Sequence, residues 1–263
     1  MSLRSTIKKH TPWPLHYLYR KIYYFPQDAG AAIDFIFHST KSPTSFGTRF
    51  GLVARFYKIS YYVDCPHTEH EMIVITRKIL NLGPDVKGVI AEAGAFHGGS
   101  TAKLSLVAAL CGRTLDVFDS FEGMPQNEEA GGASIYGRVH HFPKGSHAVG
   151  LEEVRENVAM YGDIARCRFH KGWLADTLRD FHEPVACACM NVDLAQSTKD
   201  CLKYFYPLAA AAGGIIISQD AHFPWIIELL RDGSYWKNEL HVQTPPMEGL
   251  GVSKFVTITP LRA

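Results

Sequence analysis

Short apolar stretches that alternate with helical patterns constrain the fold of this chain more than any other feature. Residues 185–192 and 214–218 contain no charged side chain, as expected of strands in a sheet that helices cover on both faces. Further strands are expected at residues 88–93, 114–119 and 166–170. A helical segment follows each strand, so the pattern predicts a doubly wound α/β fold with a mostly parallel sheet.

Local signals mark where several helices begin. Thr68 and Glu71 have the spacing of a capping box in front of an apolar helical run. Ser100 is expected to cap the helix at residues 100–111, and Pro224 suits the first turn of a later helix. The remaining helices are expected at residues 151–160, 174–181 and 197–206.

The end of the chain distinguishes two classes of α/β protein. Two extended stretches, at residues 239–244 and 253–259, are joined by a segment too short for a crossover helix. They should therefore pair antiparallel, which gives a seven-stranded sheet closed by a C-terminal hairpin. Class I methyltransferases have this arrangement, whereas dinucleotide-dependent dehydrogenases end their sheet with another parallel strand.

The first part of the chain differs from the rest. Residues 1–64 are rich in aromatic side chains and lack the alternation of a strand. We expect short helices and loops there, serving as a lid or an oligomer contact, with plain core packing as the alternative. The chain then divides into a helical extension, residues 1–64, and a main domain, residues 65–263. Exposed aromatic residues would make a homodimer or a higher homo-oligomer the expected assembly.

Charge and composition exclude several classes of partner. The 27 Lys and Arg residues nearly balance the 26 Asp and Glu residues, whereas nucleic-acid-binding proteins usually show a basic excess. The sequence shows neither an apolar run of about 20 residues nor the pattern of a secretory signal, so no membrane association is expected. None of the six cysteines forms a Cys-x-x-Cys pair, which favours reduced thiols in a cytoplasmic protein.

The loop after the first strand has the composition of a cofactor site. Gly94, Ala95 and Gly98 allow a ligand to approach the backbone, and free N–H groups are expected where the helix opens at Ser100. These groups suit the carboxylate of S-adenosylmethionine (SAM), and Glu92 can accept a hydrogen bond from the ammonium of the same molecule. The nicotinamide fingerprint is not met, because Phe96 stands where that motif needs its second glycine.

Two more segments contribute candidate cofactor residues. Asp119 ends the second strand, where an acid can bind both ribose hydroxyls, and Ser120 follows it. Gly172 and Trp173 follow the third strand, where the indole can stack on the adenine. Asp119 as a turn cap and Trp173 as a core residue are the alternatives.

Four ordered segments resemble the macrocin O-methyltransferase family. They are the loop at 92–100, the motif Asp-Ser-Phe-Glu-Gly-Met-Pro at 119–125, Asp-Leu-Ala-Gln-Ser-Thr at 193–198, and the stretch at 206–217. The resemblance covers about residues 68–260. It implies SAM as cofactor and methylation of a hydroxyl on a small molecule, of sugar or polyketide type, in natural-product and antibiotic biosynthesis.

The resemblance also implies a Mg²⁺ site of three carboxylates. Asp193 and Asp220 match two of them, and Gln219 stands in place of the third. An amide oxygen coordinates Mg²⁺ without contributing negative charge, so a weakened site and no site both remain open. Asp193 also lies where it can contact the cofactor and the reacting atoms.

A methyl transfer to oxygen needs a group that removes the hydroxyl proton. His222, two residues after Asp220, is the first candidate for this base, and Asp193 is a second candidate catalytic residue. His141 is a third, in the long loop at residues 122–150 that we expect to cover the acceptor. N-methylation, a cyclisation without methyl transfer, and a non-catalytic scaffold are the competing hypotheses.

Overall fold

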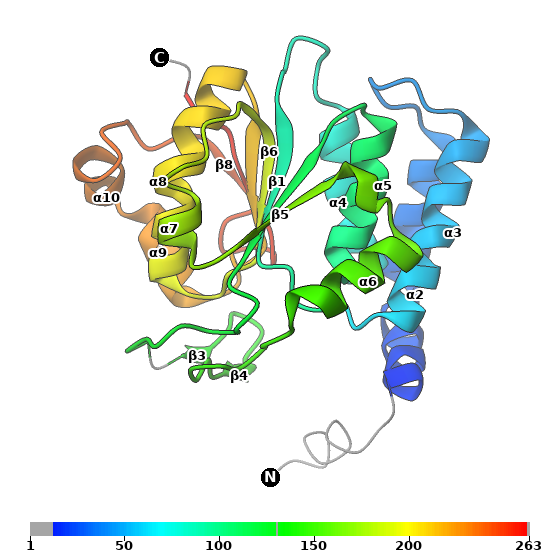
Figure 1. The fold of residues 1–263 in the computed structure, drawn as a ribbon, viewed down its shortest axis with the longest axis horizontal. Coiled ribbons are helices and arrows are strands. Elements are labelled where there is room, and N and C mark those ends of the chain that lie inside the picture. Colours follow the sequence, from blue (N-terminus) through cyan, green and yellow to red (C-terminus); the bar gives the residue numbers. More distant parts are fainter. Residues whose placement is uncertain (1–12, 130, 262–263) are drawn as a thin grey trace.

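A single mixed sheet organises the protein. The computed structural model describes residues 13–129 and 131–261, and Figure 1 shows the sheet edge-on between two layers of helices. The sheet has seven strands in the order β5-β2-β1-β6-β7-β9-β8. The strands are β1 (Val89–Ala93), β2 (Leu115–Asp119), β5 (Cys167–Lys171), β6 (Val185–Met190), β7 (Ile215–Ser218), β8 (Met247–Glu248) and β9 (Val256–Ile258). The predicted fold class is confirmed.

The direction of the strands places the loops that matter. Strands β5, β2, β1, β6 and β7 are parallel, while β9 runs antiparallel to β7 and β8 antiparallel to β9. From β1 the chain adds β2 and β5 on one side of the sheet and then β6 and β7 on the other, so the strand order switches between β1 and β6. In such sheets ligands bind beside the carboxyl ends of the strands, at this switch point.

Helices cover both faces of the sheet (Figure 1). One layer consists of α4 (Glu69–Leu80), α5 (Gly99–Leu110) and α6 (Leu151–Tyr161), and the other of α7 (Leu174–Thr177), α8 (Ala195–Ala212), α9 (Pro224–Arg231) and α10 (Gly233–Asn238). Alternate residues of one strand serve the two layers: Ile90 packs in the core under α5, and Ala91 packs in the core under α8. The buried strands are therefore apolar on both sides.

The N-terminal segment is more regular than its sequence suggests. It forms two long helices, α2 (Trp13–Phe37) and α3 (Phe46–Tyr62), instead of the expected short helices and loops. Phe35 and Ile36 of α2 and Phe56 of α3 are buried in the same core as Ile90. Pro26 lies inside α2, and aromatic residues point both inward and outward. This mixture hides the helical period in the sequence.

Two local predictions are wrong. Ser100 does not cap α5; the cap is Gly98, whose φ of 80° is left-handed and disfavours a side chain. The first C-terminal strand lies at Met247–Glu248 and not at residues 239–244, which follow helix α10. Residues 239–244 alternate between polar and apolar side chains as a strand does, but Leu240 and Val242 pack against the core without joining the sheet. The strand that does form is only two residues long and has no clear pattern in the sequence. The antiparallel pairing of the two strands is confirmed.

The long loop after β2 contains structure of its own. Residues 132–133 and 139–140 form a small antiparallel ladder, β3 (Gly132–Ala133) with β4 (Val139–His140). Figure 1 shows this ladder at the end of the molecule where the parallel strands terminate. Residue 130, within the predicted loop, lies outside the described part of the chain.

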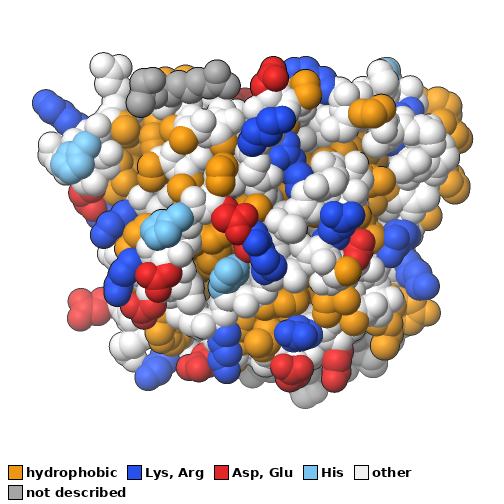
Figure 2. All heavy atoms as spheres, turned by 45° about the horizontal axis from the view of Figure 1, so that its top comes forward, with side chains coloured by type: hydrophobic (Ala, Val, Ile, Leu, Met, Phe, Trp, Pro, Cys, Tyr) orange, Lys and Arg blue, Asp and Glu red, His pale blue; other side chains and the backbone are white. Residues whose placement is uncertain are grey.

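The surface fits the balanced charge of the sequence. On the face shown in Figure 2, Lys and Arg side chains are interspersed with Asp and Glu side chains. In residues 13–129 and 131–261, no helix combines the length and the apolar character needed to cross a bilayer.

Candidate active site

Strained backbone marks the carboxyl end of the sheet. Phe96, Phe121 and Asp193 have positive φ values of 51°, 57° and 62°, and they follow β1, β2 and β6. A left-handed conformation at a residue other than glycine costs on the order of 1–3 kcal/mol and clusters at functional sites. All three residues follow neighbouring parallel strands of the sheet, at the edge where such sheets bind their ligands.

Glu92 is a buried acid near the end of β1. Its side chain is only 2% exposed, and its Oε2 has no hydrogen-bond partner among the described residues. Burial raises the pKa of Glu92 to about 7, the hydroxyls of Ser100 and Thr101 oppose this shift, and the charge of Asp119 adds to it. A buried carboxyl with a free oxygen is well suited to a cationic ligand group.

The loop from β1 into α5 brings backbone N–H groups to the same place. Gly94 has a φ of 90°, and a Cβ there would lie 2.2 Å from the carbonyl oxygen of Asn191. Gly98 caps α5, and no described side chain accepts a hydrogen bond from the first turn of that helix. Free N–H groups at a helix N-terminus attract an anion. Ser100 and Ala95 are buried beside them.

Asp119 joins the loops that carry the other candidate cofactor residues. Its carboxylate accepts hydrogen bonds from the backbone N–H groups of Ala95 and Phe121, both at 2.7 Å. Its carbonyl oxygen accepts a hydrogen bond from the N–H of Gly172 at 3.0 Å. Ser120 makes a local turn, accepting from the N–H of Glu122. Asp119 therefore acts as a turn cap, and each of its oxygens keeps a lone pair for a ligand.

Trp173 lies at the edge of the cofactor region. Its side chain is 39% exposed, which argues against the core-packing alternative. It precedes α7, and the φ of 150° at Gly172 turns the chain toward it. The exposed indole can provide a flat apolar surface for a ring.

Two carboxylates meet at the ends of β6 and β7. Asp220 is fully buried, and its Oδ2 accepts hydrogen bonds from the N–H groups of Val192 and Asp193 at 2.8 and 3.1 Å. Burial raises the pKa of both Asp193 and Asp220, and their mutual repulsion raises that of Asp193 further. Within the described part of the chain, Asp220 Oδ1 and Gln219 Oε1 are buried without a hydrogen-bond partner.

The donor set does not fit the three-carboxylate Mg²⁺ site that the resemblance implies. Only two acids are present, one oxygen of Asp220 is committed to the backbone, and Gln219 contributes no charge. Nowhere in residues 13–129 and 131–261 do three or more His, Cys, Asp or Glu side chains gather as a metal cluster. Mg²⁺ depends on carboxylate charge for its affinity. These residues therefore do not support activation of the acceptor by Mg²⁺.

His222 lies next to this acidic pair. It is 8% exposed, and its Nδ1 lacks a partner among the residues described. Burial, with the nearby charges of Lys254 and His140, lowers the pKa of His222 to about 4. The ring is thus neutral at pH 7 and has a nitrogen free to accept a proton.

The loop after β2 supplies an aromatic wall around His222. His140 contacts the rings of His222 and Phe223, with centroids 6.0 and 4.9 Å apart. The Ile135 N–H donates to the carbonyl of His222 at 2.9 Å. His141, the residue singled out from the sequence, is exposed; its neighbour His140 is the histidine that the fold brings to the site.

Two contributors to the site have no signal of their own in the sequence. The carboxylate of Glu129 accepts hydrogen bonds from the N–H groups of Ala195 and Gln196, at 2.8 and 3.1 Å, and so caps α8 from another loop. The indole of Trp225 donates to the carbonyl of Asp193 at 2.8 Å. The only hint was the lack of a capping side chain at Leu194, where α8 begins.

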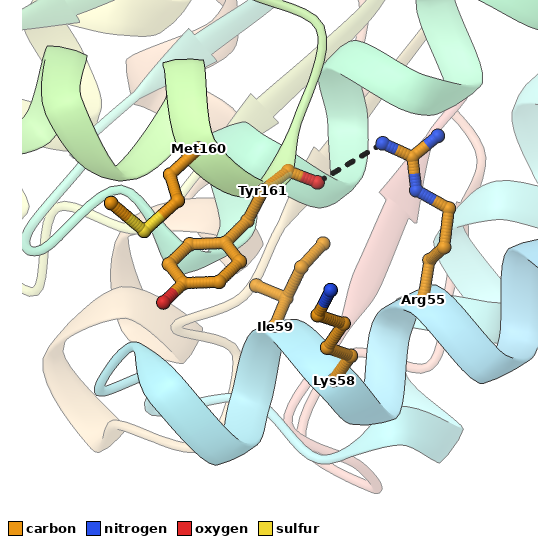
Figure 3. Close-up of a pocket in the computed structure, with 5 residues that line it drawn as sticks. All are labelled: Arg55, Lys58, Ile59, Met160 and Tyr161. Atoms are coloured by element: carbon orange, nitrogen blue, oxygen red, sulfur yellow. Dashed lines mark hydrogen bonds between the residues drawn. The ribbon is translucent and has the colours of Figure 1, made fainter.

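A separate hollow lies on the outer helical layer. It has a volume of about 280 Å³ and is lined by Arg55, Lys58 and Ile59 of α3 with Met160 and Tyr161 of α6. Figure 3 shows Arg55 reaching the backbone carbonyl of Tyr161, a hydrogen bond of 3.2 Å. None of these residues comes from the strand ends, so the hollow does not belong to the active site.

The sheet order and the acids at the ends of β1 and β2 are those of a class I SAM-dependent methyltransferase. The macrocin O-methyltransferase (TylF) family model matches residues 70–247, and the chain belongs to this family of SAM-dependent O-methyltransferases.

Relatives agree with this assignment. The chain is 31% identical over 204 residues to demethyldecarbamoylnovobiocin O-methyltransferase of Streptomyces niveus, which covers 66% of this chain and 78% of that protein. It is 31% identical over 206 residues to 8-demethyl-8-(2,3-dimethoxy-alpha-L-rhamnosyl)-tetracenomycin-C 4'-O-methyltransferase of Streptomyces olivaceus, covering 72% and 76%. The solved O-methyltransferase NovP is 26% identical, with a TM-score of 0.59 over 74% of this chain and 83% of that one.

Proposed function

We propose that this enzyme methylates a hydroxyl of a small-molecule natural product of sugar or polyketide type. The observation that carries the proposal is the similarity to two enzymes whose names state such acceptors. One of these acceptors bears a rhamnosyl group. The acceptor wall built from histidine and aromatic rings supports it, because such rings pack well against a flat ring or a sugar face.

We propose that the cofactor binds across the ends of β1, β2 and β5. The N-terminus of α5, with Gly94, Ala95, Gly98 and Ser100, would hold the carboxylate. Glu92 would accept from the ammonium, which then satisfies its free oxygen.

At the other end of the cofactor, Asp119 would bind the ribose hydroxyls with Ser120 shaping the turn. Trp173 would stack on the adenine, with Gly172 leaving room for it. Asp193 would close the site beside the reacting methyl group.

We propose His222 as the base, with Asp193 as the second candidate. When bound, the cofactor supplies an electrophilic methyl group. The enzyme's own residues must then align the acceptor hydroxyl and take its proton. His222 is neutral and has an open nitrogen, and His140 and Tyr136 flank its ring, with centroids 6.0 Å away. His141 is a weaker candidate because it is exposed.

We also propose that the enzyme is a homo-oligomer held together by the outer helices. Large apolar side chains of α2 and α3 are exposed: Ile22, Tyr23, Phe25, Ile33, Phe37, Phe46 and Phe50. In this proposal residues 1–64 are an extension that carries the contact, and residues 65–263 form the methyltransferase domain; residues 1–12 lie outside the described chain. Light scattering tests the assembly. None of the six cysteines forms a disulfide, which supports a cytoplasmic setting.

The experiment that tests the function has two stages. Calorimetric titration with SAM establishes cofactor binding independently of any acceptor. Formation of S-adenosylhomocysteine is then measured with a panel of glycosylated and unglycosylated polyketides and their free sugars. Turnover on hydroxylated members, and none on methyl-blocked ones, is the expected result. SAM binding without turnover on any hydroxyl of the panel would contradict the proposed acceptor class.

A further inference from the structure

The ladder of β3 and β4 presents one face to the acceptor site. Gly132 lies directly opposite His140 in this ladder, so both residues face the same side. A Cβ on Gly132 would lie 3.3 Å from the ring of Trp225. The ring of His140 contacts those of His222 and Phe223. This inner face of the ladder therefore lies against the residues that surround the proposed base.

Ser134 belongs to the same inner face. It comes two residues after Gly132, and its N–H donates to the carbonyl of Arg138 at 2.8 Å, which continues the pairing one step beyond the ladder. Successive side chains of a strand alternate between its two faces, so Ser134 is directed to the inner side. Burial agrees with this alternation, because Ser134 is only 5% exposed whereas Ala133 and Val139 on the other face are exposed.

The hydroxyl of Ser134 has no partner in the protein. Its Oγ is buried and makes no hydrogen bond to any of the residues 13–129 and 131–261. By contrast, Ser146 of the same loop donates its hydroxyl to the carbonyl of Pro143 at 2.7 Å. A buried hydroxyl without a partner destabilises the folded chain, and a ligand that supplies the partner recovers this loss. Ser134 is therefore suited to a ligand more than to the fold.

Two contacts hold the residues after Ser134 on His222. The N–H of Ile135 donates to the carbonyl of His222 at 2.9 Å, and the ring of Tyr136 stacks on the imidazole with centroids 6.0 Å apart. The Nδ1 of His222 is likewise buried without a partner among the described residues. A hydroxyl and a ring nitrogen, both open to a ligand, therefore belong to the same part of the acceptor site.

We propose that Ser134 is a specificity-determining residue whose hydroxyl binds a second oxygen of the acceptor, on the same ring as the hydroxyl that is methylated. The inference rests on the proposed function, and it narrows the acceptors to rings that carry at least two oxygens. A serine hydroxyl donates to a hydroxyl or an ether oxygen and accepts from a hydroxyl, so it suits either kind of second oxygen. Binding this oxygen fixes which hydroxyl of the ring reaches His222.

The first test measures stability and needs no acceptor. Because the Ser134 hydroxyl has no partner to lose, Ser134→Ala should unfold at the same urea concentration as the wild type or at a higher one. Ser146→Ala is the matched control and should unfold at a lower concentration, since it loses the hydrogen bond to Pro143. If Ser134→Ala is destabilised as much as Ser146→Ala, the hydroxyl serves the fold and the proposal is overturned.

The second test pairs the variant with altered acceptors. The kcat/KM is measured for the best acceptor of the panel and for analogues that each lack one further oxygen of the methylated ring. The wild type should lose about 10-fold on one analogue, and Ser134→Ala should lose about 10-fold on the full acceptor. On that analogue Ser134→Ala should lose almost nothing more, because the same hydrogen bond is already absent. The SAM dissociation constant should stay unchanged, and Ser146→Ala should discriminate as the wild type does.

The two proposals fail in different ways. If Ser134→Ala still discriminates against the analogue about 10-fold, or if the methylated ring of the best acceptor carries a single oxygen, the role of Ser134 is contradicted while the proposed function stands. Failure of the wild type to form S-adenosylhomocysteine from any acceptor contradicts the proposed function itself. The urea comparison does not depend on turnover, so it tests Ser134 in either case.

Discussion

The cofactor half and the acceptor half of the active site are built differently. In the cofactor half, at the ends of β1, β2 and β5, one residue at a strand end holds the loops: the carboxylate of Asp119 accepts from the N–H groups of Ala95 and Phe121, and its backbone carbonyl accepts from the N–H of Gly172. In the acceptor half, at the ends of β6 and β7, side chains from distant segments do so, as Glu129 caps α8 and Trp225 bonds Asp193.

This difference suits the two ligands. The cofactor is a single molecule, so short loops with a set backbone path can hold it in many related proteins. The acceptor differs between relatives, and side chains on a long loop can change without disturbing the sheet. If the halves are independent, substitutions in one should change cofactor binding, and substitutions in the other should change acceptor kinetics alone.

The largest effect is expected from His222→Ala. Loss of a general base typically lowers the rate by roughly 10²- to 10⁴-fold, so kcat should fall within this range while SAM binding stays unchanged. The measurement pairs steady-state kinetics with calorimetry. His141→Ala is the control and should have little effect, because His141 is exposed. If the His222→Ala enzyme has a nearly normal kcat, His222 is not the base, and Asp193 becomes the candidate that removes the proton of the acceptor hydroxyl.

Asp119→Ala should have the next largest effect, in the cofactor half. Loss of hydrogen bonds to a charged group costs about 1.5–3 kcal/mol, so the SAM dissociation constant should rise roughly 10- to 100-fold. The variant should also melt earlier, because the N–H groups of Ala95 and Phe121 lose their partner. Acceptor KM at saturating SAM is the discriminating measurement: a large change there would show that the halves are not independent.

Glu92 gives a pH test of the same half. Its pKa of about 7 in the folded protein lies above the ordinary 4.5, and the cofactor ammonium needs the charged carboxylate. SAM affinity of the wild type should therefore fall about tenfold for each pH unit below about 6, and Glu92→Gln should remove this dependence.

The effect of Glu92 on the stability of the protein has the opposite pH dependence to its effect on SAM affinity. Between pH 4.5 and 7 the folded protein holds a proton on Glu92 that the unfolded chain releases, so this contribution to the free energy of unfolding decreases as pH rises through that window. Glu92→Gln should be more stable than the wild type at pH 8 and not at pH 4. Urea unfolding at the two pH values measures the difference, and equal stabilities at both would mean that Glu92 titrates normally.

The smallest effect is expected from Glu129→Ala, in the acceptor half. Loss of a helix N-cap costs about 0.5–2 kcal/mol, and the loop that carries β3 and β4 loses its attachment to α8. The acceptor KM should rise about 5-fold with the SAM dissociation constant unchanged. Glu128→Ala, at the exposed neighbouring residue, is the matched control. If the SAM dissociation constant changes while the acceptor kinetics stay normal, Glu129 belongs to the cofactor half and not to the acceptor half.

The sequence by itself determined the strand–helix alternation, the closing antiparallel strands and the positions of Glu92, Asp119, Asp193 and Asp220 at strand ends. These features depend on neighbours in the chain: apolar runs make buried strands, and an acid just beyond a strand has only one edge of the sheet to occupy. Pro224 at the start of α9 and the Thr68 capping box are local in the same sense.

Only the tertiary structure decided which distant groups meet. It brings His140, and not its neighbour His141, to His222, because the ladder of β3 and β4 sets which side of the loop faces the sheet. It also brings the ammonium of Lys254 to Glu71 of α4, and lets Glu129 cap a helix that begins 66 residues later. Such contacts depend on packing between segments far apart in the chain, where no local spacing records them.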